Sequence, residues 1–268
     1  SKDKINIIDK YSLIDLETIG STGSPLVHES FDYIYKNVKK DILVASLSGG
    51  TDIVGCFIGG NPMSVVRRGE IQGPILGMDV HVYDENANSL KNEKGELVCI
   101  KSFPSMPLYF WNDKNNEKYH DAYFNKYENV WCHGDYILKT ENNGFIIFGR
   151  SDTTLNPGGV RIGTAEIYRQ VEQIEEILEG LVVGQIWQGD TRVVLFVRLI
   201  ETSHLTKDLI NQIKTKIREG ASPRHVPTKI IAVKDIPRTK SGKIVELAVR
   251  DLIHNIQINN ITALANPE

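Results

Sequence analysis

The stretch PRTKSGK, residues 237–243, ends in a lysine that follows Ser-Gly, as some phosphate-binding loops do. The Walker A loop requires G-x-x-x-x-G-K-[ST], because its glycines let backbone N–H groups wrap the phosphates. In this chain Pro237 stands at the first glycine position and Ile244 at the hydroxyl position. The stretch is therefore not a P-loop. Taken alone, it is better explained as a polar turn before a helix, since proline and glycine mark turns.

The surroundings of Lys243 are unusually basic for a chain whose net charge is −3. Residues 207–243 contain ten Lys or Arg against three acids. A local positive field of this kind suits a small polyanion. A solvated helix face is the alternative explanation for most of these lysines.

Length and composition indicate a soluble globular protein of one large domain or two smaller ones. The 268 residues are 41% hydrophobic and 24% charged, and no apolar run is long enough to cross a bilayer. Cys56, Cys99 and Cys132 lie far apart without metal-ligand spacing, which suits a reduced, cytoplasmic protein. The overall charge argues against non-specific nucleic-acid binding, and no obligate protein partner is evident.

The first half of the chain has the pattern of a mixed α/β domain. Apolar residues at helical spacing predict a helix over 28–40, and DILVASL (41–47) predicts a buried strand. Short apolar runs and frequent glycines between 53 and 111 predict a small antiparallel β unit. ENNG (141–144) predicts a further hairpin turn.

The second half has the pattern of a compact α+β module. An apolar stripe predicts an amphipathic helix over 164–180, with Thr164 as its cap and Gly180 at its end. The other expected elements are a hairpin around QGD (188–190), a helix over 207–220, a strand over 228–233, a last helix over 243–256 and a frayed tail, ANPE (265–268).

Four motifs precede the lysine stretch in a definite order: STGSPL (21–26), SGGTD (48–52), HGD (133–135) and GRSDTT (149–154). With PRTKSGK following the last of them by about 90 residues, this order resembles the adenylate-forming superfamily of acyl-CoA synthetases, adenylation domains and luciferases. Within that superfamily, SLSGGTDIVGCF and PRTKSGK resemble most the acetoacetyl-CoA synthetase family.

The resemblance implies a division of the chain into two domains. Residues 1–149 would be the end of a large α/β AMP-binding domain that includes an antiparallel β subdomain. Residues 150–152 would form a hinge, and 153–268 a small, mobile α+β C-terminal domain. The superfamily's Ser/Thr/Gly-rich phosphate loop has no counterpart before residue 21. We therefore expect the chain to be a fragment of a longer enzyme and to be inactive alone.

The resemblance also implies which residues contact ATP. Asp135 would accept hydrogen bonds from the ribose hydroxyls, and Asp52 would provide an oxygen to Mg²⁺. The arginines suit phosphate and ribose because the planar guanidinium pairs with two oxygens at once. The nucleotide-binding set implied is Gly23, Ser24, Pro25, Ser48, Gly49, Gly50, Thr51, Asp52, Asp135, Arg150 and Arg161. Caps, turns and surface ion pairs are the structural alternatives for these residues.

Lys243 acquires a catalytic role from the same resemblance. Its ammonium would stabilise the charge that builds on the α-phosphoryl group when a carboxylate attacks ATP. Ser241 and Gly242 would form an adaptable turn that lets the lysine enter the cleft. Rotation at Asp152 would then exchange Lys243 for the glycine-rich stretch PGGVR.

The second half-reaction uses CoA in this family. Gly158 and Gly159 would leave room for its pantetheine arm, because they have no side chains. Arg218 lies 25 residues before Lys243, where related synthetases place an arginine on the CoA 3′-phosphate. A basic residue that pairs with a helix C-terminus is the alternative for Arg218.

Two residues depart from the family pattern, one at the adenine site and one at the acyl pocket. Ser48 stands where many relatives place an aromatic residue on adenine, so adenine must be held otherwise. Gly49 stands where acetyl-specific relatives place a tryptophan, so it would widen the acyl pocket and favour acetoacetate over acetate. The implied enzyme is an acetoacetate–CoA ligase that uses ATP with Mg²⁺ and CoA. A domain that loads a carrier protein and a non-catalytic nucleotide-binding module are the alternatives.

Overall fold

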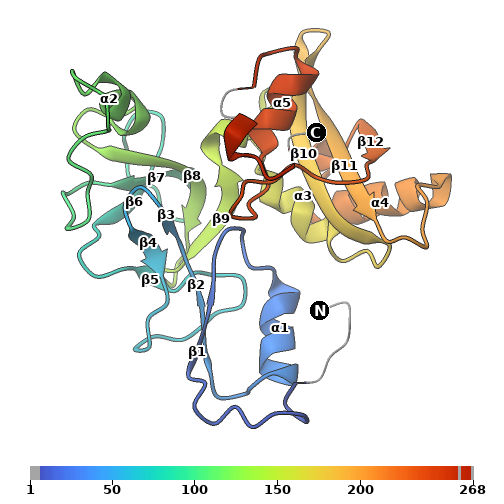
Figure 1. The fold of residues 1–268 in the computed structure, drawn as a ribbon, viewed down its shortest axis with the longest axis horizontal. Helices are drawn as coiled ribbons and strands as arrows, with labels where there is room; N and C mark the ends of the chain where they lie inside the picture. The colour runs from blue at the N-terminus through green and yellow to red at the C-terminus, as the bar shows by residue number, and fades with distance from the viewer. Residues whose placement is uncertain (1–6, 259–260, 267–268) are drawn as a thin grey trace. The chain divides into compact units, whose positions relative to one another are not determined.

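The computed structural model describes residues 7–258 and 261–266 and divides into two compact units, Ser1–Ile147 and Phe148–Glu268 (Figure 1). The division falls close to residue 149, where the sequence motifs separate the two expected domains. Residues 1–6, 259–260 and 267–268 lie outside the described part, so the start of the expected domain 1–149 and the end of the expected domain 153–268 are not described.

The first unit begins with a β-α-β segment. β1 (Thr18–Ser21) and β2 (Leu43–Ser46) are paired in parallel, with Ser21 opposite Ser46. The connection between them contains α1 (His28–Asn37), which buries Phe31. The helix and the strand are those that the apolar patterns predict, although α1 ends three residues before the expected limit of 40.

Two antiparallel sheets follow, as the glycine-rich pattern predicts. One has the order β3-β4-β5 and the other β6-β7-β8-β9. Their core contains Phe57, Phe103, Trp131 and Phe145, all at most 5% exposed. The strands are β3 (Ser48–Gly50), β4 (Gly55–Gly59), β5 (Gly73–Pro74), β6 (Val80–Tyr83), β7 (Lys94–Cys99), β8 (Trp131–Lys139) and β9 (Phe145–Arg150).

A short helix, α2 (Glu117–Tyr123), is not predicted by the sequence pattern. Its apolar contacts come from aromatic rings: Tyr123 stacks on Trp131 with ring centroids 3.6 Å apart. The Tyr119 hydroxyl donates to Pro107 O at 2.5 Å. These contacts fix α2 although, at seven residues, it is too short to be stable alone.

The second unit is built on the sheet β10-β11-β12, with helices on both faces (Figure 1). Alternate residues of β10 point to opposite sides, as the period of two requires. Val182 packs with α3 and α4, whereas Leu181 and Val183 pack with residues of α5. The elements are α3 (Thr164–Val171), β10 (Ile177–Trp187), β11 (Asp190–Leu199), α4 (Lys207–Gly220), β12 (Lys229–Ala232) and α5 (Glu246–Ile253).

The helix expected over 164–180 is wrong in its second half. α3 ends at Val171, and β10 begins at Ile177, which pairs with Leu199. Gly180 therefore lies inside a strand, and Leu178, assigned to the apolar stripe, is 42% exposed. Pairing with the long strand β11 outweighs the helical preference of this segment, an override that local pattern cannot reveal.

Thr164 is the first helical residue of α3 and not its cap, which is Gly163. α5 begins at Glu246 and ends at Ile253, inside the expected range of 243–256. α4 and the hairpin between β10 and β11 agree with their patterns. α4 has the predicted bounds, and the Thr206 hydroxyl caps it by accepting from Leu209 N at 3.2 Å. Gln188 and Gly189, at φ 53° and 84°, form the tight turn between β10 and β11. Short 3-10 helices lie at η1 (Ser151–Thr153), η2 (Pro157–Gly159), η3 (Pro223–His225) and η4 (Ile261–Ala263).

The tail expected to fray is anchored at Asn266. Its side-chain amide donates to Asp235 Oδ2 at 2.7 Å and to Ile236 O at 3.0 Å, and its oxygen accepts from Arg238 N. Pro267 and Glu268 lie outside the described residues.

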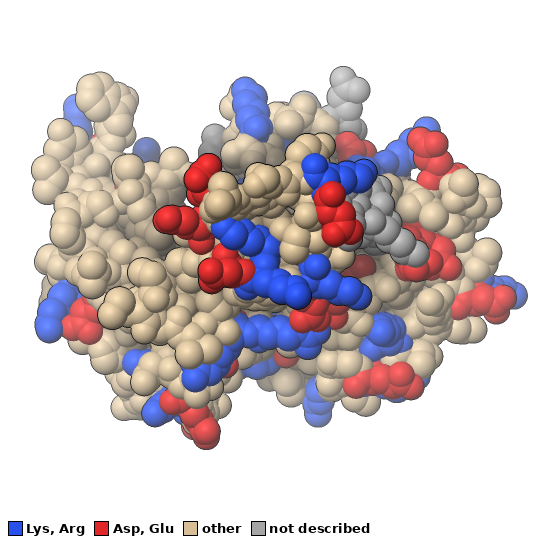
Figure 2. Space-filling view, turned by 90° about the horizontal axis from the view of Figure 1, so that it is seen from below, with Lys and Arg blue, Asp and Glu red and all other residues tan. Residues whose placement is uncertain are grey.

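One face of the molecule gathers Lys and Arg side chains near its centre (Figure 2). On the face drawn in Figure 2, Lys and Arg stand beside Asp and Glu. Within residues 7–258 and 261–266, no helix is both long and apolar enough to cross a bilayer.

Candidate functional site

In the first unit, two loops that contain candidate residues start from the same sheet edge. β1 and β2 run parallel, so the segments that leave their carboxyl ends emerge together. One loop contains Gly23, Ser24 and Pro25, and the other leads into β3. The carboxyl edge of parallel strands is where α/β proteins bind ligands.

Gly23 satisfies the physical requirement for close approach to a flat ligand. Its φ is 91°, a conformation that favours glycine, and nothing lies within 4 Å of the position that a Cβ would take. The loop after β1 therefore has open space at the candidate position.

Ser48 and Asp135 are joined by a buried hydrogen bond. Ser48 Oγ donates to Asp135 Oδ2 at 2.8 Å, and the two residues are 9% and 7% exposed. The bond connects β3 to β8 across 87 positions of sequence. A hydrogen bond to a buried carboxylate contributes about 1.5–3 kcal/mol and fixes the orientation of the carboxylate. Ser48 thus has a local role that the sequence pattern does not indicate.

Asp135 lies in an irregularity of β8 rather than in a turn. Glu96 on β7 pairs with Tyr136, whereas Val98 pairs with Cys132, so the pairing register shifts between them. Gly134 within this stretch has φ 81°. Bulges of this kind redirect side chains beside functional sites, and here the bulged residue next to Gly134 is the candidate ribose ligand.

Thr51 and Asp52 lie in the exposed turn between β3 and β4. The Tyr123 hydroxyl donates to Asp52 Oδ2. α2, the helix that the sequence pattern missed, therefore positions this carboxylate. Asp52 Oδ1 lies over the backbone of Gly50, where a Cβ would collide with it.

Asp52 fits a Mg²⁺ site only if phosphates of a bound nucleotide supply further ligands. Among the described residues, no group of three or more His, Cys, Asp or Glu side chains could hold a metal ion. Mg²⁺ in ATP sites is held by one or two carboxylates together with substrate phosphates and water. A single exposed carboxylate suits that chemistry and does not suit an all-protein metal site.

Gly49 is packed against the neighbouring strand. A Cβ there would lie 2.9 Å from Cys56 Cβ and closer still to Gly55 O and Cys56 Cα. Gly49 pairs with Cys56 across the β3–β4 ladder. Close backbone packing therefore gives a reason for glycine that is separate from the expected acyl pocket, and the pocket role of Gly49 stays a prediction.

In the second unit, Lys243 closes a tight turn at an exposed position. Lys243 O accepts from Thr239 N at 2.8 Å, and Lys243 N donates to Thr239 Oγ1 at 3.1 Å. Gly242, at φ 85°, donates its N–H to Thr239 O at 2.8 Å. The stretch is a hydrogen-bonded turn, and its expected adaptability stays a prediction.

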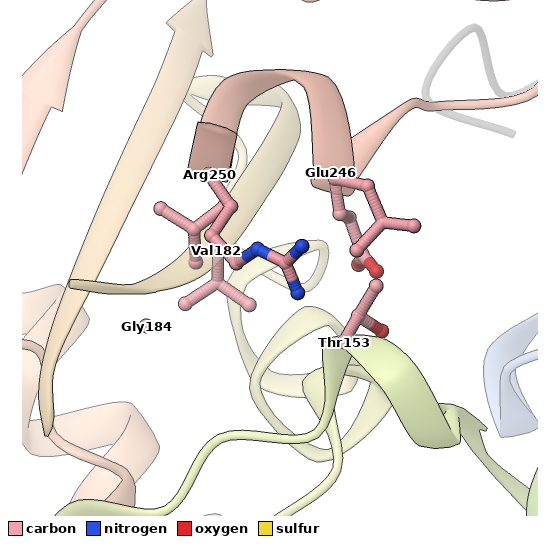
Figure 3. A pocket seen from close by; sticks show the side chains of 7 residues that line it. Thr153, Val182, Gly184, Glu246 and Arg250 are labelled. Carbon is pink, nitrogen blue, oxygen red and sulfur yellow. The ribbon is translucent and has the colours of Figure 1, made fainter. Parts of the chain in front are cut away.

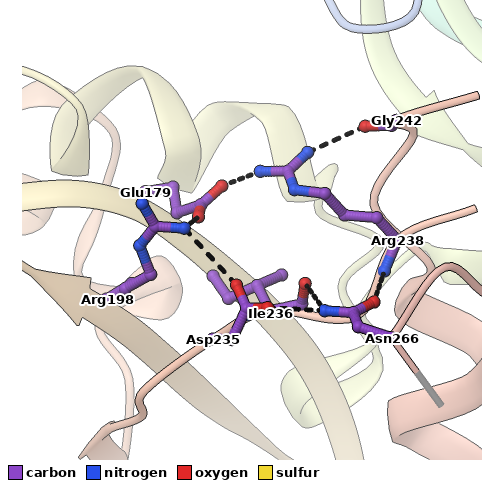
Figure 4. Close-up of polar contacts among 7 residues, drawn as sticks. All are labelled: Glu179, Arg198, Asp235, Ile236, Arg238, Gly242 and Asn266. Carbon is purple, nitrogen blue, oxygen red and sulfur yellow. Dashed lines mark hydrogen bonds and ion pairs between the residues drawn. The ribbon is translucent and has the colours of Figure 1, made fainter.

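The turn is also tied to the sheet behind it (Figure 4). Arg238 Nη1 donates to Gly242 O at 2.8 Å, and Arg238 Nη2 forms an ion pair with Glu179 on β10. Glu179 pairs in addition with Arg198 on β11 at 2.7 Å. Shared between two arginines, Glu179 anchors the base of the Lys243 turn.

A closed loop presents Gly158 and Gly159. Leu155 and Ile162, both buried, exchange two backbone hydrogen bonds of 2.9 Å and close the loop. Gly158 has φ 58° and Gly159 φ 76°, and Gly158 N donates to Asp190 Oδ1 at 3.1 Å. Asp190, at the start of β11, is a site-supporting residue that the sequence analysis missed.

The remaining candidates occupy varied positions in the second unit. Arg150 ends β9 and pairs with Asp152 at 3.7 Å, where η1 begins. Arg161 lies in the loop that Leu155 and Ile162 close. Arg218 is exposed in the last turn of α4, which also fits a simple helix-dipole role.

Sequence comparison relates the chain to named proteins. A scan against protein-family models found no match. The acetoacetyl-coenzyme A synthetase of Rhizobium meliloti (strain 1021) is 59% identical over 258 residues, which cover 96% of this chain and 40% of that protein. The acetoacetyl-CoA synthetase of Mus musculus is 44% identical over 263 residues, covering 97% and 39%. The chain thus spans about 40% of the length of these curated relatives.

Solved structures give the same picture for the fold. An acetoacetyl-CoA synthetase from Streptomyces lividans matches with a TM-score of 0.89 and 39% identity, covering 97% of this chain and 40% of that one. A benzoate CoA ligase from Burkholderia xenovorans LB400 matches with a TM-score of 0.73 and 23% identity, covering 87% and 45%. The second likeness concerns the fold alone.

Proposed function

Because this chain is homologous to acetoacetyl-CoA synthetases over nearly its whole length and has the fold of CoA ligases, we propose that it is part of an ATP-dependent acid:CoA ligase. The reaction proceeds in two steps. An acid and ATP form an acyl-adenylate and pyrophosphate, and the adenylate and CoA then form acyl-CoA and AMP. The acid is acetoacetate, and the observation that carries this proposal is the 59% identity spread over 96% of the chain.

The first unit would bind the nucleotide. Asp135, oriented by Ser48, accepts from the ribose hydroxyls, and the open backbone at Gly23 lies against adenine together with Ser24 and Pro25. Thr51 offers its hydroxyl to phosphate. The Asp52 carboxylate, fixed by its bond from Tyr123, is the group that would hold Mg²⁺, which neutralises phosphate charge when bound.

The second unit would supply the groups that differ between the two steps. The Lys243 ammonium stabilises negative charge on the α-phosphoryl group during attack by the acid. Arg150 and Arg161 contact the nucleotide, and residues 150–152 form the hinge at which Asp152 turns. In the second step, Gly158 and Gly159 pass the pantetheine thiol, and Arg218 pairs with the CoA 3′-phosphate.

Pyrophosphate exchange and thioester formation by the full-length enzyme that contains this chain test the proposal. Among short acids, acetoacetate should support the fastest ATP–pyrophosphate exchange, and CoA should be needed for thioester. Absence of exchange with every acid would refute the ligase function. Acyl transfer to a carrier protein but not to CoA would favour the carrier-loading alternative. Because the chain spans about 40% of its relatives' length, we expect the isolated chain not to turn over.

A matched pair of variants tests the role of the lysine. Lys243→Ala should abolish adenylation, whereas Lys240→Ala, an exposed lysine of the same turn, should leave it unchanged. The second step, measured with supplied acyl-adenylate, should survive Lys243→Ala. Equal losses in both variants would show that bulk positive charge, and not the position of Lys243, matters.

A further inference from the structure

The helix that follows the Lys243 turn contains an acid and an arginine with no part in the proposed chemistry. α5 begins at Glu246, three residues after Lys243, and Arg250 lies one helical turn further along the same face. Figure 3 shows both side chains pointing toward Thr153, in a pocket that β10 also lines.

The Glu246 carboxylate is enclosed by residues of two other elements, α3 and η1. The Tyr168 hydroxyl on α3 donates to Glu246 Oε1, and Tyr168 Oη itself accepts from Val182 N on β10 at 3.0 Å. Thr153 and Thr164 lie beside the Glu246 side chain, and the Thr153 hydroxyl itself donates to Arg150 O at 3.1 Å. The burial that these contacts produce raises the pKa of Glu246 above its ordinary value.

Arg250 binds the backbone of the expected hinge. Its Nη1 donates to Asp152 O at 3.0 Å. Its Nε and Nη2 both bond Asp251 Oδ1, at 3.1 and 2.9 Å, which holds the guanidinium plane in place. Because the acceptor is a main-chain carbonyl, this bond restrains the backbone of η1 directly.

Two features therefore connect η1 to α5. Arg250 binds the main chain at Asp152, and the Glu246 side chain packs beside Thr153 in the same pocket. Only Ile244 and Val245 separate Glu246 from Lys243, and the turn of Lys243 is closed by its own hydrogen bonds. A displacement of η1 is thus transmitted to the lysine through short, hydrogen-bonded links.

We propose that Glu246 and Arg250 are positioning residues that join η1 to the turn of Lys243, so that rotation before Asp152 moves the lysine as part of one rigid body. This inference rests on the proposed function, in which Lys243 acts in adenylation and residues 150–152 are the hinge. Neither side chain touches substrate. Both act by fixing where the ammonium arrives when the hinge turns.

Arg250→Met and Arg250→Lys in the full-length enzyme separate this role from simple stability. Arg250→Met should slow single-turnover adenylation about tenfold without changing the Kd of ATP, whereas Arg250→Lys, which keeps a donor for Asp152 O, should recover most of the rate. When Lys243 is already alanine, Arg250→Met should cause no further loss in the residual rate. A loss of equal size in both backgrounds, or an unchanged rate in Arg250→Met, would overturn the proposal.

Proteolysis of the same proteins gives a readout that does not depend on activity. Trypsin cleavage after Arg150, measured by mass spectrometry relative to cleavage after Arg68 in the other unit, should be faster in Arg250→Met and in Glu246→Ala than in the wild type. Equal cleavage would overturn the attachment even if both variants lost activity. An inactive wild-type enzyme would refute the ligase function, while the cleavage ratio would still decide the attachment.

Discussion

Gly49 offers a test of why a glycine stands beside the candidate nucleotide site. The expected acyl-pocket role and the observed packing predict different consequences for Gly49→Ala. If the glycine only leaves room for an acid, a methyl group should change the preference for acids and spare the fold. If instead β3 and β4 pack so closely that only glycine fits at position 49, the methyl group should destabilise the first unit.

The structure sets the size of the effect. The new Cβ would stand 2.9 Å from Cys56 Cβ, and nearer to Gly55 O and Cys56 Cα, whereas carbon atoms pack at about 3.5–4.0 Å. Two of these three neighbours are backbone atoms, so no side-chain rotation relieves the clash and β3 must move from β4. Overpacking costs about 1–3 kcal/mol and each weakened ladder bond about 1 kcal/mol. We expect Gly49→Ala to lower the free energy of unfolding by about 2–4 kcal/mol.

Gly73→Ala is the matched control. Gly73 lies in the same sheet, on β5, and nothing lies within 4 Å of the position of its absent Cβ. Urea unfolding can be followed by the fluorescence of buried Trp131, with the exposed Trp111 and Trp187 replaced by phenylalanine. If the unfolding free energies of the two glycine variants agree within about 0.5 kcal/mol, the packing argument is refuted.

Three further variants test other contacts. Ser48→Ala should weaken AMP binding by the full-length enzyme about tenfold, or ~1.4 kcal/mol, because Asp135 loses its buried donor; calorimetry that gives an unchanged Kd would contradict this. Asp190→Ala should slow thioester formation several-fold and spare pyrophosphate exchange, because Gly158 N loses its acceptor; Asp190→Asn, which keeps an oxygen, is the control, and equal loss in both steps would argue against a loop-specific effect. Burial raises the pKa of Glu246 above its ordinary 4.5, so the folded chain binds more protons than the unfolded chain between these two values, and this group lowers stability as pH rises through that window. Urea unfolding of Glu246→Gln should therefore show it gaining on the wild type as pH rises, and parallel pH curves would disprove this.

The sequence pattern predicts an element correctly where contacts of the element's own residues determine its structure. The apolar spacing of Leu209, Ile213 and Ile217 predicts α4 with its observed bounds. The tight turn after Trp187 likewise follows from Gly189, which adopts positive φ without a steric penalty. In α4 the stabilising contacts repeat at the helical period that the sequence displays.

Pattern fails where a distant segment decides. The stretch after Val171 has helical spacing, yet its pairing with β11 makes it a strand. The bond between Ser48 and Asp135 joins residues 87 positions apart, and α2 depends on Trp131, which lies beyond its end. No periodicity encodes such contacts, so the sequence motifs could locate candidate residues and could not say what holds them.

The Lys243 turn shows why this distinction matters for mechanism. An ammonium stabilises developing charge best when it needs no rearrangement at the moment of reaction, and the bonds from Thr239 and Arg238 hold the backbone of the turn from which the Lys243 side chain extends. If the turn keeps these bonds while the enzyme exchanges Lys243 for another group, the movement must come from dihedral angles outside the turn, such as those of the expected hinge at residues 150–152.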